Sequence, residues 1–108
     1  YSYTYVVDAA LAAFYLLLLG ENGSAVNIVD SSSDIMLKDL AAILAKSAGT
    51  EVVFELPDDI ERSGYSTATK AILDDTRIIQ LGWKPYTSIE EGLQKTIEIF
   101  KNGFFRFT

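Results

Sequence analysis

An unbroken apolar run over residues 9–19 constrains the fold of this chain more than any other feature. The hydroxyl of Tyr15 is its only polar side-chain group. The run is too short to cross a bilayer, which takes about 20 residues. Neither a basic segment before it nor a small-residue cleavage pattern after it marks a secretory signal. We therefore expect a cytoplasmic protein without membrane contact. A helix that is apolar all round is buried on several sides, and because so small a domain cannot bury one completely, we expect part of its face to be covered by protein that is missing here.

Composition narrows the function further. The 108 residues fit one small domain, and the 49% apolar content excludes intrinsic disorder. Because the chain has no Cys and no His, it has no thiolate zinc site, no cysteine nucleophile and no histidine base. We expect no metal. The net charge of −6, without a cluster of Lys and Arg, argues against nucleic acid as a partner.

Aromatic and β-branched residues predict three short strands, over residues 1–7, 25–29 and 51–56. Pro57 stops the last of them. With the helices below, this pattern indicates the α+β class: a small mixed domain of three or four short strands and about four helices.

Helix signals are clearest in four places. Asp8 is positioned to cap a helix over residues 9–19, and apolar spacing predicts a second helix over residues 37–48, closed near Gly49. A short helix is expected over residues 75–81. The last helix starts at Ser88, which forms a capping-box pattern with Glu91. Residues 58–70 show no period and are expected to form a long loop.

Familiar catalytic motifs are absent. The scattered glycines match no phosphate-binding loop. Tyr65 and Lys70 are spaced by five residues, whereas the Tyr-x-x-x-Lys pair of short-chain dehydrogenases needs four, so we assign no catalytic residue. Trp83, with Gly82 before it and Pro85 after it, is interpreted as the anchor of a compact connector between helices.

The connector at residues 81–85 is one of several segments, spread over residues 1–101, that together resemble a known family. The strings LGWKP at 81–85, SIEEGL at 88–93 and KTI at 95–97 resemble the C-terminal end of the NAD-dependent epimerase/dehydratase family, the extended short-chain dehydrogenase/reductases that act on nucleotide sugars. Residues 73–77 resemble its A-D-x-S-K segment. YTYVVD at 3–8 and GENG with VNI at 20–28 resemble further segments of the same family in the same order.

The resemblance implies that residues 1–101 are the C-terminal substrate-binding domain of a larger enzyme, with an apolar tail over residues 102–108. The expected ligand is a nucleoside diphosphate sugar. The NAD cofactor and the Tyr-x-x-x-Lys pair would belong to a missing N-terminal Rossmann domain, so the chain alone would be inactive. Whether the parent enzyme is an isomerase or a lyase stays open. A homodimer is possible.

The same resemblance suggests binding residues. Arg62 and Lys70 are candidate ligands of the diphosphate, and Tyr3 and Tyr65 are candidate neighbours of the base or sugar. The family often carries Arg where this chain has Tyr1, which weakens the match for phosphate contact. Solvent-exposed loop cations are the alternative interpretation of Arg62 and Lys70. For the whole chain, the alternative is a standalone acidic interaction or dimerisation module.

Overall fold

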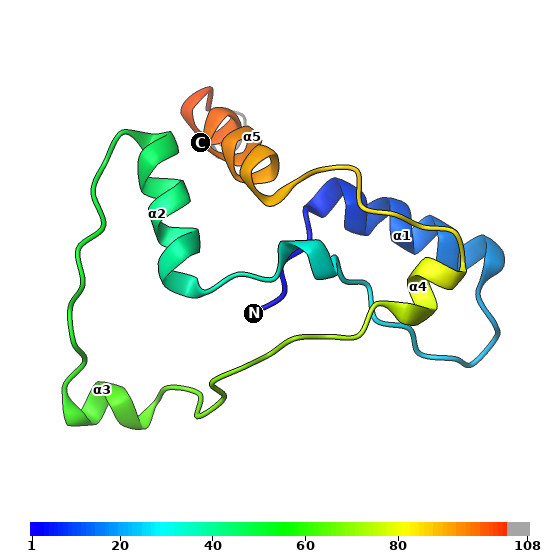
Figure 1. Cartoon of the computed structure of the whole chain (residues 1–108), viewed down its shortest axis with the longest axis horizontal. Coiled ribbons are helices and arrows are strands. Elements are labelled where there is room, and N and C mark those ends of the chain that lie inside the picture. Colours follow the sequence, from blue (N-terminus) through cyan, green and yellow to red (C-terminus); the bar gives the residue numbers. More distant parts are fainter. Residues whose placement is uncertain (104–108) are drawn as a thin grey trace.

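The computed structural model describes residues 1–103, which form five α-helices and one 3₁₀ turn (Figure 1). The elements are α1 (Val6–Leu19), η1 (Ser31–Ser33), α2 (Leu37–Ala48), α3 (Asp59–Ser63), α4 (Thr76–Gln80) and α5 (Ile89–Lys101). In this part of the chain, no helix combines the length and the apolar character needed to cross a membrane. Residues 104–108 of the expected apolar tail lie outside the described residues.

The expected α+β class is wrong, because residues 1–103 form no strand and no sheet. The segments 25–29 and 51–56 are not helical, but neither pairs with another segment. A strand requires backbone hydrogen bonds to a neighbouring strand as well as suitable side chains. The expected strand over residues 1–7 is also absent, and its last two residues already belong to α1, which begins at Val6.

What remains of sheet pairing surrounds the N-terminal segment. Ser2 and Asp34 form an isolated antiparallel bridge. Tyr1 and Ile35 exchange backbone hydrogen bonds of 3.0 and 3.2 Å. On the other side, the Ser2 N–H donates to the Ala71 carbonyl at 3.1 Å. The first two residues therefore lie between two segments that are distant in sequence.

The core forms where α1 meets α4 and the connector before α5. Ala12, Ile78 and Trp83 are fully buried there. Partly buried apolar side chains surround this cluster: Tyr15, Leu16, Val26, Ile28 and Leu81. The Trp83 indole N–H donates to the Asp8 carbonyl at 3.0 Å, so its polar atom is satisfied inside the core. The interpretation of Trp83 as a connector anchor is confirmed.

Only one stripe of α1 faces this core. Asp8 and Ala12 are buried one turn apart. Phe14, Leu17 and Leu18 are 61, 78 and 78% exposed, and we call these three residues the outer face of α1. The described residues therefore leave part of α1 uncovered, as expected for a domain of this size.

The expected capping of α1 by Asp8 is also wrong. The helix starts three residues earlier than expected, with Tyr5 at the N-cap and no side-chain cap. Asp8 lies in the first turn, where its Oδ2 accepts the Thr87 N–H at 3.0 Å. The carboxylate thus holds the connector before α5 and does not close its own helix.

Three expected helices are confirmed within a residue or two. The helix α2 ends at Gly49, whose φ of 71° is the left-handed conformation that glycine adopts readily. At the start of α5, Ser88 Oγ accepts the Glu91 N–H at 3.2 Å. The helix α4 falls inside the expected range 75–81. Figure 1 shows α2 beside α5, and these two helices pack against each other.

The segment from 50 to 75 leaves the rest of the molecule and returns to it. The helix α3 lies at the turning point of this segment. The expected long loop over residues 58–70 is therefore wrong at residues 59–63, which are helical. Asp58 and Glu61 form a reciprocal capping box there. The Cα radius of gyration is 16.9 Å, whereas a compact domain of about 100 residues has about 13 Å. Figure 1 shows α3 far from α1, α4 and α5.

Candidate functional site

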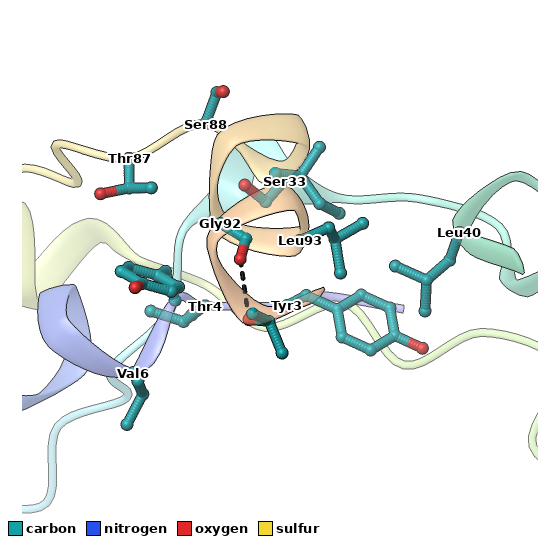
Figure 2. A pocket seen from close by; sticks show the side chains of 12 residues that line it. Tyr3, Thr4, Val6, Ser33, Leu40, Thr87, Ser88, Gly92 and Leu93 are labelled. Atoms are coloured by element: carbon teal, nitrogen blue, oxygen red, sulfur yellow. Dashed lines mark hydrogen bonds between the residues drawn. The ribbon is translucent and has the colours of Figure 1, made fainter. Parts of the chain in front are cut away.

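A pocket of about 320 Å³ opens where the N-terminal segment crosses the first turns of α5 (Figure 2). Twelve residues from four parts of the chain line it: Tyr3, Thr4, Tyr5, Val6, Ser33, Leu40, Thr87, Ser88, Ile89, Gly92, Leu93 and Thr96. We call it the hydroxyl pocket, because seven of these side chains carry a hydroxyl group and none carries a formal charge. Its volume is within the range of small-molecule sites.

Contacts on both sides of the pocket hold it in shape. The bond from the Thr87 N–H to Asp8 Oδ2 ties the start of α5 to α1. Gly92 is buried, and a Cβ atom there would lie 3.0 Å from the Tyr5 ring. Glycine at this position therefore lets the Tyr5 ring lie directly against the α5 backbone.

A buried carboxylate supports the far wall. Asp30 is 2% exposed, and its Oδ2 accepts the hydroxyl of Ser33 at 2.6 Å. Its Oδ1 accepts hydrogen bonds from Ser32. The Asp30 N–H in turn donates to Thr4 Oγ1 at 3.1 Å. Because Thr4 and Ser33 both line the pocket, this network fixes two of its hydroxyls.

The four residues proposed from the sequence lie in different places. Tyr3 lines the hydroxyl pocket, and Figure 2 shows its ring near Leu40 and Leu93. Arg62 is in α3, and Tyr65 follows that helix. Lys70 lies in the returning segment, where the Ala71 carbonyl meets Ser2. These last three are exposed and line no pocket described in this section.

The structure therefore brings Lys70 into the neighbourhood of the N-terminal segment, but it does not gather all four residues at one site. The role of each as a ligand stays a prediction.

Sequence reasoning missed the contribution of α5. Thr87, Ser88, Gly92 and Thr96 line the pocket, and Thr96 donates to the Gly92 carbonyl at 2.8 Å. One available signal was Gly92 itself. A glycine inside a helix costs about 1 kcal/mol relative to alanine, so its presence points to a close packing contact.

Two further pockets are more polar. One, of about 420 Å³, lies between the turn after α1 and α4. Its Arg77 is engaged by the Ala25 carbonyl at 3.0 Å. The other, of about 520 Å³, follows the α2–α5 groove and is lined by charges of both signs, with Lys101 donating to the Ser47 carbonyl.

Within residues 1–103, no group of three or more acidic residues could hold a metal ion. The positive-φ glycines Gly49, Gly82 and Gly103 follow the ends of helices, and Gly23 lies in the turn after α1. None of these four glycines opens a helix, whereas the glycines of a dinucleotide-binding loop do.

One carboxylate outside the pocket has a perturbed acidity. Hydrogen bonds from the Thr76 hydroxyl and backbone N–H lower the pKa of Asp74, and the Arg77 guanidinium lowers it further. Asp74 is exposed just before α4 and lines none of the pockets described above. Its hydrogen bonds from Thr76, the first residue of α4, hold the start of that helix.

Comparison with known proteins relates the chain to a nucleotide-sugar enzyme by sequence similarity. The chain is similar to GDP-L-fucose synthase from Sinorhizobium fredii (strain NBRC 101917 / NGR234), with 30% identity over 102 residues. The match covers 91% of this chain and 30% of that protein, so the chain spans less than a third of this relative. No family model and no solved structure matches the sequence. The similarity suggests a relationship to nucleotide-sugar enzymes.

Proposed function

We propose that this chain binds a nucleoside diphosphate sugar as the substrate-binding part of a nucleotide-sugar epimerase, dehydratase or reductase. The observation that carries the proposal is the similarity to GDP-L-fucose synthase over 91% of the chain. The motifs at 81–97 and 3–8 support it, because they resemble the C-terminal part of such enzymes. The hydroxyl pocket supports it further, because its volume of about 320 Å³ is in the range of small-molecule sites.

In this proposal the chain binds and positions substrate and carries no catalytic residue. The hydride chemistry of NAD, and the Tyr-x-x-x-Lys pair, belong to a Rossmann domain that acts together with it. Arg62 and Lys70 are proposed ligands of the diphosphate, because a cation reduces the cost of holding two phosphates. Tyr3 and Tyr65 are proposed neighbours of the base or sugar.

A second candidate function is an interaction or dimerisation module. The outer face of α1 favours this function, since its three large apolar side chains are exposed to solvent. A partner domain would cover the same face, so this observation supports either function. A measurement of nucleotide-sugar binding distinguishes the two functions, because only the first requires it.

Calorimetric titration of the chain with a panel of nucleoside diphosphate sugars, including GDP-L-fucose, tests the proposal. Saturable binding that weakens in Arg62→Ala and Lys70→Ala, but not in the matched α2 variant Lys38→Ala, supports both the function and the two ligands. Binding that all three variants retain supports the function and removes Arg62 and Lys70 from the site. No heat of binding at millimolar ligand would overturn substrate binding by this chain.

A further inference from the structure

The hydroxyl pocket has the hydrogen-bonding character of a site for a neutral, hydroxylated ring. Thr4 Oγ1 accepts a bond from the Asp30 N–H and keeps its own proton to donate. Ser33 Oγ donates to Asp30 and keeps lone pairs to accept. Within residues 1–103, the hydroxyls of Tyr3 and Tyr5 form no hydrogen bond. The pocket thus offers donors and acceptors together.

The remaining lining is apolar. Val6, Leu40, Ile89 and Leu93 contribute aliphatic surface, and Tyr3 and Tyr5 contribute aromatic rings. A sugar ring presents hydroxyl groups around its edge and C–H groups on its faces, so both kinds of lining have a counterpart on it. A phosphate does not fit this lining, because burying an anion without a cationic partner is costly.

A cation stands beside the pocket and not inside it. Lys95 Nζ lies 6.0 Å from the centre of the Tyr5 ring, and Tyr5 is part of the lining. Lys95 is exposed on the second turn of α5. The Lys95 ammonium group is thus a cation close to the pocket, available to a phosphate attached to a ring inside it.

We infer that the hydroxyl pocket holds the sugar ring of the nucleotide sugar and that Lys95 contacts the phosphate next to that ring. The phosphate contact rests on the proposed function, whereas the sugar contact does not. The inference assigns only the phosphate next to the sugar, and Arg62 and Lys70 stay proposed ligands of the other phosphate of the diphosphate.

Two probes test the two contacts separately. Methyl hexopyranosides, which are uncharged, are assayed by saturation-transfer NMR, and nucleoside diphosphate sugars by calorimetry. Tyr3→Phe and Tyr5→Phe each remove one hydroxyl and are expected to weaken both probes by about 3- to 10-fold. Lys95→Gln is expected to weaken only the nucleotide sugar, and to reduce the salt dependence of its binding.

Lys101→Gln is the matched control, since it removes the same charge at the other end of α5. Leu93→Trp, which fills the pocket, is expected to abolish binding of both probes, and circular dichroism reports whether that variant folds. If Leu93→Trp does not fold, the tyrosine variants still decide the test, because Phe is nearly isosteric with Tyr.

The outcomes separate the inference from the proposed function. Nucleotide-sugar binding that the Tyr3, Tyr5 and Lys95 variants leave unchanged overturns the pocket assignment and leaves the function standing. Saturable glycoside binding without nucleotide-sugar binding overturns the function and the Lys95 contact, and supports the pocket as a sugar site. No binding of either probe overturns both.

Discussion

The Trp83 indole N–H and the Asp8 carbonyl are joined by a buried hydrogen bond of 3.0 Å. Four residues after Trp83, the Thr87 N–H donates to the carboxylate of the same Asp8. One residue of α1 therefore holds the connector to α5 at two points. The position of the hydroxyl pocket depends on these bonds, because Thr87 and Ser88 line it.

Trp83→Phe should destabilise the chain although it preserves an aromatic ring. The change removes one buried hydrogen bond to the Asp8 carbonyl, so we expect the free energy of unfolding to fall by about 0.5–1.5 kcal/mol. Trp83→Ala should cost about 3–5 kcal/mol through the cavity it creates. Urea unfolding measures both. Tyr86→Phe, at an exposed position of the same connector, is the control. An unchanged midpoint for Trp83→Phe would contradict the importance of this bond.

Gly92→Ala should reverse the usual effect of this substitution in a helix. Alanine normally stabilises a helix interior by about 0.5–1 kcal/mol. Here its Cβ would lie 3.0 Å from the Tyr5 ring, so the ring or α5 must shift. We expect a lower melting temperature and weaker binding in the pocket. Gln94→Ala, exposed on the same helix, is the control. A higher melting temperature for Gly92→Ala would show that the packing is looser than described.

Asp58→Ala should melt α3 without unfolding the molecule. The substitution removes the cap of the Glu61 N–H, a loss of about 1 kcal/mol for the helix. Because residues 58–64 are exposed, we expect global stability to stay the same while hydrogen exchange in α3 accelerates. Asp59→Ala, which does not cap, is the control. A fall in global stability would mean that α3 is coupled to the core.

Asp74 should contribute to acid sensitivity. Its pKa is lower in the folded chain than in the unfolded chain, so its ionised form stabilises the fold at pH values above the unfolded pKa. That contribution disappears as the pH falls from about 4 through the lowered folded value. Asp74→Asn should therefore flatten the acid side of a stability–pH curve. Glu55→Gln, which also removes one negative charge, is the control. If it flattens the acid side of the stability–pH curve as much as Asp74→Asn does, Asp74 has no special role in acid sensitivity.

The outer face of α1 should drive association of the isolated chain. Leu17→Glu and Leu18→Glu each place a charge on an exposed apolar surface, and should reduce a concentration-dependent mass in sedimentation. Gln80→Glu adds the same charge on α4, away from this face, and should leave the mass unchanged. A wild-type chain that sediments as a monomer at high concentration would contradict the expectation.

Local signals predicted the helices better than the sheet. Gly49, Ser88 and the apolar spacing of residues 37–48 determine their helix ends through contacts within a few residues, so the sequence predicted α2 and α5. Whether residues 51–56 become a strand depends on a partner segment, which composition does not reveal. Asp8 was misassigned for a similar reason, because its partner Thr87 lies 79 residues away.

The candidate site was predicted in part. Tyr3 was named from the resemblance and lines the hydroxyl pocket. The other lining residues come from the N-terminal segment with the start of α1, from η1, from α2 and from the start of α5, and only the packing of these parts brings them together. Lys95 was not considered as a ligand, because a lone lysine on an amphipathic helix carries no signal of its own.

The segment that carries α3 connects two parts of the chain, and contacts outside this segment join the part before α3 to the part after it. The bond between Asp8 and Trp83 joins the two parts, and so does the packing of α2 on α5. Pairing of Ser2 with the Ala71 carbonyl adds a third connection. A polypeptide severed within α3 should therefore persist as a noncovalent complex of its two pieces, and separately produced pieces should reassemble by fragment complementation.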